Sequence, residues 1–199
     1  MTVDPDSAAS LTHVLVQQHA QNECERVATE ELVGRGVLGE AEGRHAVDPA
    51  RPEDVLVRAV VSRVCTAAVT VDGAIVGEIG RGLLALVGVG REDDADRART
   101  LARKVHELRV FPTEDGARSV GDLGLPVLVV SQFTLYADTR RGRRPSWADA
   151  APGETAEPLV DEVVAELRRR GSEVATGVFG ARMLVSSVNE GPMTLLLEV

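Results

Sequence analysis

An apolar run that ends in polar residues constrains the fold of this 199-residue chain more than any other feature. Every residue from Leu125 to Val130 is apolar, and Ser131, Gln132 and Thr134 follow within four positions. A short β-branched apolar run flanked by turn residues is typical of a buried strand. Polar side chains and free main-chain N–H groups meet where such a strand leaves the core. We therefore expect a buried strand here, with a functional site at its end.

Residues 55–199 are predicted to form an α+β domain, with a single mixed or barrel-like sheet and two inserted helices. Alternating or continuous apolar residues predict strands at 57–64, 67–72, 75–79, 83–89, 127–130, 173–179, 182–188 and 194–199. Asp72-Gly73 predicts a tight hairpin between the second and third of these, because both residues tolerate positive φ. The run at 83–89 is apolar throughout, which indicates a strand buried on both faces.

Two helices are predicted from apolar residues at three- and four-residue spacing. The first begins at Asp93 or Asp94, and the second runs from about Ala156 to Arg170 with Thr155 as its N-cap. Residues 113–123 and 137–152 are expected to be loops, and residues 189–194 a polar turn that closes onto the last strand.

Residues 1–54 differ in composition from the rest of the chain. They contain 11 acidic and 4 basic side chains, a net charge of −7, whereas residues 55–199 carry only −2. Glycines and a proline-containing stretch at 48–54 interrupt any helical pattern. We expect an N-terminal extension, poorly structured, followed by a domain at 55–199.

Several function classes are disfavoured. No apolar run approaches the roughly 18 residues that a membrane span needs, and no signal pattern opens the chain. Residues 55–199 contain a single histidine, His106, expected on a helix surface, and neither cysteine matches a metal-ligand spacing. We expect a cytoplasmic protein with no metal, cofactor or membrane partner, and no histidine-activated nucleophile.

Residues 131–134, Ser131, Gln132, Phe133 and Thr134, are the best candidates for catalysis. The plainer interpretation is a strand that happens to end in hydroxyls and an amide. The functional one is a pocket wall whose main-chain N–H groups face a developing oxyanion, with Gln132 and Phe133 on either side of an adenine or an ester. Main-chain donors can do this without an ionisable side chain.

Two segments together resemble a known family. Ser-Gln-Phe-Thr at 131–134 and Asn-Glu-Gly-Pro-Met-Thr at 189–194 are similar to the paired motifs of bacterial and eukaryotic D-aminoacyl-tRNA deacylases, usually Ser-Gln-Phe-Thr and Asn-x-Gly-Pro-Val-Thr. The resemblance extends over residues 57–199. It implies a homodimeric hydrolase that proofreads chirality by cleaving the ester between tRNA and a D-amino acid, or glycine on tRNA(Ala). It also implies that residues 1–54 lie outside the family, so that translation could begin at Val55 or Val57.

The resemblance gives roles to the second motif. It implies that Gly191-Pro192 is a cis dipeptide that reaches into the pocket of the other subunit and excludes L side chains by rigid main chain, as part of a substrate-binding segment. The members of that segment are Asn189, Gly191, Pro192, Met193 and Thr194. Met193 stands where valine is usual, which leaves the pocket shape open. Arg63 is implied to brace this loop.

An arginine cluster has two interpretations. Arg140, Arg141, Arg143 and Arg144 fall within five positions. They form either a solvated loop or a set of phosphate contacts for the tRNA acceptor end, which the planar guanidinium suits.

Two questions stay open from the sequence. Either Thr134 or Ser131 attacks the ester directly, or the protein positions the substrate while the terminal 2′-hydroxyl of the tRNA assists water; the absence of an adjacent base favours the second. The rival to an enzyme is a homodimeric β-rich module that binds RNA ends or amino-acid ligands without turnover.

Overall fold

The computed structural model describes residues 57–140 and 143–199, all of which belong to the compact unit Val55–Val199. The expectation of an unstructured extension at 1–54 and the candidate Arg141 lie outside the described residues. None of the helices in the described part combines the length and apolar character that crossing a membrane requires.

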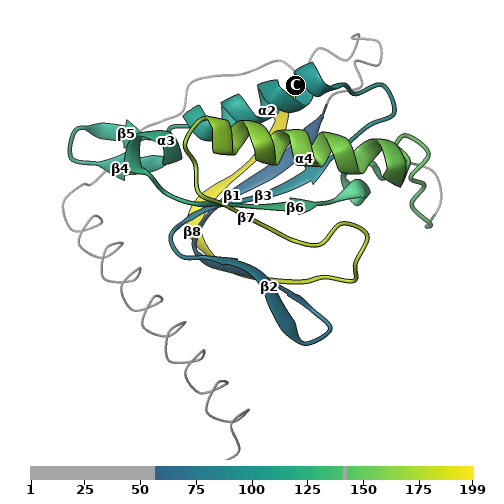
Figure 1. The fold of residues 1–199 in the computed structure, drawn as a ribbon, viewed down its shortest axis with the longest axis horizontal. Coiled ribbons are helices and arrows are strands. Elements are labelled where there is room, and N and C mark those ends of the chain that lie inside the picture. Colours follow the sequence, from purple (N-terminus) through teal and green to yellow (C-terminus); the bar gives the residue numbers. More distant parts are fainter. Residues whose placement is uncertain (1–56, 141–142) are drawn as a thin grey trace, which may run out of the picture. The chain divides into compact units, whose positions relative to one another are not determined.

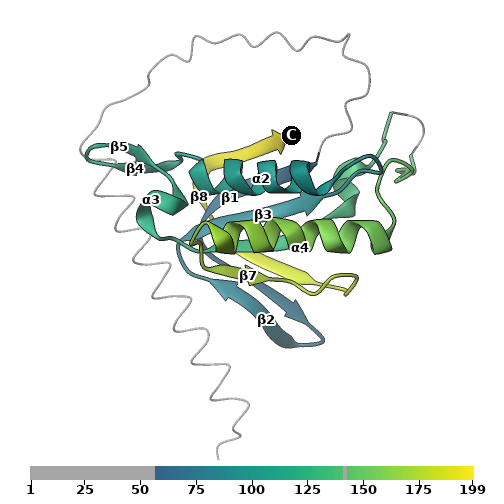
Figure 2. The same ribbon diagram turned by 45° about the horizontal axis from the view of Figure 1, so that its top comes forward.

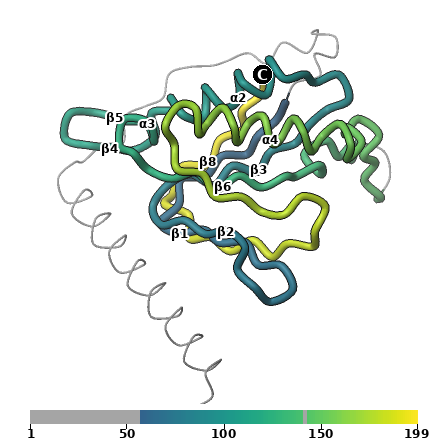
Figure 3. Tube along the Cα trace, in the orientation of Figure 1, coloured from purple at the N-terminus to yellow at the C-terminus, as the bar shows by residue number. Residues whose placement is uncertain are grey.

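The sheet is built around one long strand, β1 (Arg58–Val71). Its first half pairs antiparallel with β3 (Gly82–Gly88) and its second half with β2 (Ala74–Ile79), while β8 (Leu184–Glu198) runs antiparallel along its other side. The yellow β8 lies beside the blue β1 in Figures 1 and 3. Two further strands, β6 (Val127–Ser131) and β7 (Val174–Thr176), add in parallel, so the order is β2-β1-β3-β6-β7.

The sheet curves until its two end strands, β2 and β7, nearly meet. This agrees with the prediction of a mixed, barrel-like sheet. A Cβ atom added at Gly77 on β2 would lie 2.3 Å from the main-chain oxygen of Thr176 on β7. Only glycine allows two main chains to come so close. The sheet is therefore mixed and almost barrel-shaped.

The two expected helices cover one face of the sheet, where they lie side by side (Figures 1 and 2). Helix α2 (Ala95–Glu107) follows β3, and α4 (Gly153–Arg169) leads into β7. The Asp94 side chain caps α2 by accepting from the N–H of Arg97 at 2.9 Å. Both helices bury their apolar stripes in one cluster with β1, β3 and β6.

Helix α4 begins three residues earlier than the sequence predicted. The N–H of Thr155 donates to the carbonyl of Pro152 at 3.0 Å, so Thr155 already lies in the first turn and is not the N-cap. Pro152 occupies the N-cap position without a side-chain hydrogen bond. The Asp72-Gly73 turn is confirmed, with φ of 49° and 81°.

The prediction of a loop at 113–123 is wrong. A hairpin of β4 (Phe111–Thr113) and β5 (Gly116–Arg118) begins just before this segment and extends into it, and the one-turn helix α3 (Val120–Leu123) follows. Ser119 and Asp122 form a reciprocal capping box that stabilises this turn. Such short elements carry too few residues to show a hydrophobic period.

The expected strands at 182–188 and 194–199 are one continuous strand, β8, and the polar turn between them is a bulge. Ser62 is opposite Thr194 and Val64 is opposite Asn189, so four residues of β8 stand opposite Arg63 alone. The excess length pushes Gly191 and Pro192 out of the ladder. Strand β7 covers only three of the seven residues, 173–179, that were expected to form a strand.

Candidate active site

A pocket of about 390 Å³ opens at the end of β6, where the sequence predicted a site. Its floor comes from β3 and the end of β6, and its walls from α4 and two loops. The lining residues are Val87, Val89, Ser131, Gln132, Phe133, Trp147, Ala150, Ala151, Gly153, Ala156, Val160, Phe179 and Gly180. The lining is mainly apolar with polar groups at one end, which suits a small organic group.

The candidate catalytic residues lie where β6 passes into the 3-10 turn η1 (Phe133–Tyr136). The N–H of Gln132 donates to the carbonyl of Val87 at 2.6 Å, which continues the contact between β6 and β3. Ser131, Gln132 and Phe133 line the pocket. Thr134 is outside the lining, and its Oγ1 accepts a hydrogen bond from the side-chain amide of Gln132.

The buried carboxyl of Asp93 contacts the last residue of η1, and the sequence analysis did not identify it as part of the site. The Tyr136 hydroxyl donates to Oδ2 of Asp93 at 3.2 Å, and the N–H of Gly90 donates to the same oxygen at 2.6 Å. Burial raises the pKa of Asp93, and burial together with the Asp93 charge raises the pKa of the Tyr136 hydroxyl. The guanidinium of Arg58 lies 4.7 Å from the centre of the Tyr136 ring. Asp93 and Tyr136 are 43 residues apart, so no local motif connects them.

Aromatic side chains stand at the pocket mouth. Phe133 and Trp147 meet edge to face with ring centres 5.9 Å apart, and 57% of Phe133 is exposed. Main-chain hydrogen bonds between Asp138 and Ser146, at 2.8 and 3.0 Å, close the base of the arginine loop next to Trp147. The loop that carries the arginine cluster therefore starts beside the pocket.

The described arginines of this cluster differ in their partners. Arg140 forms two side-chain hydrogen bonds with Asp138, at 3.0 and 3.1 Å, and holds the pKa of that carboxyl below its usual range. Arg143 and Arg144 are exposed. Arg140 is thus exposed but engaged with Asp138, whereas Arg143 and Arg144 are exposed in the same loop, shortly before Trp147.

The second motif forms the bulge on β8. The Gly191–Pro192 peptide bond is cis, as the resemblance implies. Arg63 is buried, and its guanidinium donates to the carbonyls of Glu190 at 3.2 Å, Gly191 at 3.5 Å and Val110. Arg63 therefore contacts the main chain of the bulge directly.

Further hydrogen bonds connect the ends of this bulge. The hydroxyls of Thr194 and Ser62 are 3.1 Å apart, and Thr194 donates to Oδ1 of Asn189 at 3.4 Å. Met193 packs against the core cluster. The five expected substrate-binding residues thus lie in this bulge or at its two ends.

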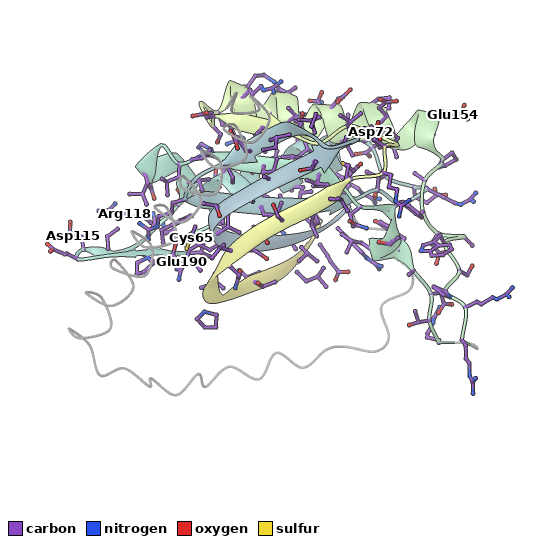
Figure 4. The ribbon with its side chains drawn as sticks, turned by 90° about the horizontal axis from the view of Figure 1, so that it is seen from below. Cys65, Asp72, Asp115, Arg118, Glu154 and Glu190 are labelled. Atoms are coloured by element: carbon purple, nitrogen blue, oxygen red, sulfur yellow. The ribbon has the colours of Figure 1, made fainter. Side chains whose placement is uncertain are left out.

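The two motifs are separated within one subunit. Ser131 is opposite Val87, Val87 is opposite Ala59, and Ala59 is opposite Leu197, so three strand spacings, about 14 Å, lie between Ser131 and β8. Met193, the nearest residue of the bulge, lies four residues further along β8, a distance of about 13 Å. Figure 4 shows Glu190 at the end of the domain that carries Asp115, opposite Glu154 of α4.

The one histidine of residues 55–199, His106, lies away from the pocket. Nδ1 of His106 is 2.9 Å from Oγ of Ser172, and the imidazole lies against Gly121. His106 does not line the pocket. Within residues 57–140 and 143–199, no three His, Cys, Asp or Glu side chains gather as metal ligands do.

Fold and site together define a class: an α+β domain whose pocket presents main chain, an amide and a hydroxyl at the end of a buried parallel strand. Solved structures with this fold include the following two. A c-Myc DNA unwinding element binding protein matches with a TM-score of 0.67 at 39% identity, over 71% of this chain and 98% of that one. A probable eukaryotic D-amino acid tRNA deacylase matches with a TM-score of 0.64 at 16% identity, over 72% of this chain and all of that one.

The chain belongs to the D-Tyr-tRNA(Tyr) deacylase family, whose model matches residues 60–198. A D-aminoacyl-tRNA deacylase of Acidothermus cellulolyticus is 62% identical over 143 residues, which cover 71% of this chain and 99% of the relative. One from Thermobifida fusca is 61% identical over the same shares. The family resemblance of the sequence is thereby confirmed.

Proposed function

We propose that this protein hydrolyses the ester bond between a D-amino acid, or glycine, and the terminal ribose of tRNA, in the cytoplasm where aminoacyl-tRNA is used. Water adds to the ester carbonyl, the bond to the ribose oxygen breaks, and the products are a free amino acid and a tRNA with both terminal hydroxyls. The observation that carries this proposal is the pocket lined by Ser131, Gln132 and Phe133 in a chain of this family.

Main-chain donors are the proposed source of catalysis. The N–H of Gln132 is used by Val87, whereas the amides of Phe133 and Thr134 open the 3-10 turn, where helical bonding leaves N–H groups without an internal acceptor. We assign the amide of Phe133, which lines the pocket, to the developing oxyanion. The Thr134 hydroxyl accepts a hydrogen bond from Gln132 and takes no part in the attack, and the terminal 2′-hydroxyl of the tRNA assists the attacking water.

Replacement of Thr134 separates this mechanism from direct attack. Thr134→Ala should keep turnover near normal, with Thr134→Ser as the matched control that keeps the hydroxyl. A loss of about 10⁴-fold in kcat with Thr134→Ala alone would assign a direct chemical role to the hydroxyl.

A second copy of the chain is proposed to complete the pocket, because the Gly191–Pro192 bulge is remote from the pocket of its own subunit. Large apolar side chains on β8 are exposed in the single chain, notably Leu184 at 69% and Leu196 at 60%. We place them in a two-fold interface that brings each bulge to the pocket of the other subunit.

Mixed dimers test this arrangement. Phe133→Ala should disable a pocket and Pro192→Ala should disable a bulge. Refolding the two inactive variants together should restore about a quarter of the wild-type activity, because half of the dimers are mixed and each has one intact site. A mixture that stays inactive, although mixed dimers form, would place both motifs in one subunit's site.

The tRNA acceptor end is proposed to lie across the pocket mouth. Arg143 and Arg144 are exposed in the loop that leads to Trp147, which pairs with Phe133 and lines the pocket. They can contact phosphates there, while Arg140 is held by Asp138.

The direct test is ester loss from D- and L-tyrosyl-tRNA incubated with the full-length protein. We expect rapid release of D-tyrosine and retention of L-tyrosine. Equal loss of both would contradict chiral selection. Tight binding of tRNA without ester loss would favour the non-catalytic module instead.

A further inference from the structure

A buried carboxylate belongs to the first residue of the Gly-Pro bulge. The side chain of Glu190 is 8% exposed, and its two oxygens accept from Nε and Nη2 of Arg81 at 3.0 and 3.1 Å. This is the paired geometry in which arginine holds a carboxylate most firmly. Arg81 belongs to the turn between β2 and β3, and Glu190 immediately precedes Gly191.

Glu190 also meets Arg63. Nε of Arg63 is 3.3 Å from Oε1 of Glu190 and donates to the main-chain carbonyl of the same residue at 3.2 Å. Two guanidinium groups therefore fix one glutamate, Arg81 through the side chain and Arg63 through both side chain and main chain. The guanidinium of Arg81 in turn lies 5.6 Å from the ring centre of the fully buried Phe111.

We propose that Arg81 is a positioning residue for chiral selection: through Glu190 it fixes the main chain of Gly191 and Pro192 in the orientation that admits a D-aminoacyl group. The inference rests on the proposed function, because the bulge must select the substrate for its position to matter. Rigid main chain discriminates by shape only while it stays in place, and a bulge outside the strand ladder needs side chains to hold it.

A role in stability alone is the alternative, and the D/L selectivity separates the two. Arg99 is the matched control, since its guanidinium also contacts two carboxylates, Asp96 and Glu162, and its side chain is 40% exposed against 34% for Arg81. Arg99 bridges α2 and α4, away from the bulge.

The experiment measures kcat/KM on D- and L-tyrosyl-tRNA, together with the melting temperature, for full-length Arg81→Ala, Arg81→Lys, Glu190→Gln and Arg99→Ala. Arg81→Ala and Glu190→Gln should each lower the D/L ratio about tenfold, by faster loss of L-tyrosine and slower loss of D-tyrosine. Arg81→Lys should restore part of the ratio, because it keeps the charge and loses the paired geometry. Arg99→Ala should lower the melting temperature and leave the ratio at the wild-type value.

Two outcomes would overturn the inference. One is a D/L ratio within about twofold of wild type in Arg81→Ala; the other is the same ratio change in Arg99→Ala, which would make it a consequence of lost stability. Should Arg81→Ala not fold, Arg81→Lys and Glu190→Gln decide by the same criterion. A wild-type protein without D preference would instead refute the proposed function, so the two failures are distinct.

Discussion

A single methyl group added at Gly88 should disturb the candidate catalytic turn. A Cβ atom there would lie 3.0 Å from the main-chain oxygen of Gln132, 3.0 Å from Cβ of Leu135 and 3.3 Å from Cδ2 of Tyr136. Two of these neighbours are main chain or stem atoms that cannot rotate away, so η1 must move by a few tenths of an ångström. Over-packing of this kind costs about 1–3 kcal/mol.

The net effect of Gly88→Ala follows from two opposing contributions. Alanine lowers the conformational entropy of the unfolded chain, which stabilises the folded state by about 0.4–1 kcal/mol. The net destabilisation is then about 1–2 kcal/mol. For a domain of this size the melting temperature should fall by roughly 3–6 °C. Because the shift moves Gln132 and Phe133, kcat/KM on D-tyrosyl-tRNA should fall about tenfold.

Gly80→Ala is the matched control for stability. A Cβ atom at Gly80 meets nothing within 4 Å, so the melting temperature should stay within about 2 °C of wild type. Calorimetry and the deacylation assay on both variants check the expectation. Full activity in Gly88→Ala would refute the reasoning that the position of η1 sets the rate.

Three further predictions concern the core, the buried carboxyl and the arginine loop. Leu167→Ala removes a fully buried side chain and should lower the free energy of unfolding by about 2–5 kcal/mol in urea titrations. Burial raises the pKa of Asp93 above 3.8 in the folded protein, so the contribution of this carboxyl to folding is fully present below pH 3.8 and is lost as the pH rises through the folded pKa. Because asparagine does not ionise, the stability of Asp93→Asn relative to wild type should increase over that rise. Arg143→Gln with Arg144→Gln should reduce the salt dependence of tRNA affinity by about 1.4 in log–log slope, measured by filter binding at several salt concentrations.

The sequence predicts what depends on local patterns. The Asp72-Gly73 hairpin, helix α2 and the buried strand β6 were all predictable, because turn chemistry and hydrophobic period act over a few residues. The position of the pocket was predictable because the apolar run that ends at Val130 is followed by polar residues from Ser131. The family resemblance supplied the cis bond at Gly191–Pro192, which residue types alone do not favour.

The contacts that position the site were not predictable, because they join distant segments. Arg81 reaches Glu190 across 109 residues, and Asp93 meets Tyr136 across 43. Nothing near either residue in the sequence shows that its partner will lie beside it. The continuity of β8 was missed for a related reason: pairing with β1 on both sides of the bulge overrides the turn-forming character of residues 189–194.

The replacement of the usual valine by Met193 is the last test of whether main chain or side chain selects the substrate. Met193 packs against the core cluster together with Leu195 and Leu197, which are alternate residues on the same face of β8. The extra length of methionine is therefore accommodated by the core, and the main chain of residue 193 is what the bulge can offer a substrate.

Met193→Val should then leave the D/L ratio of kcat/KM unchanged within about twofold. The same variant should lower the free energy of unfolding by about 1 kcal/mol, because a smaller side chain leaves part of the core contact unfilled. Comparison with Arg81→Ala separates the contribution of the Met193 side chain to the D/L ratio from that of the contacts that position the main chain of the bulge. A large change of the ratio in Met193→Val would place the methionine side chain in the pocket and would contradict selection by main chain alone.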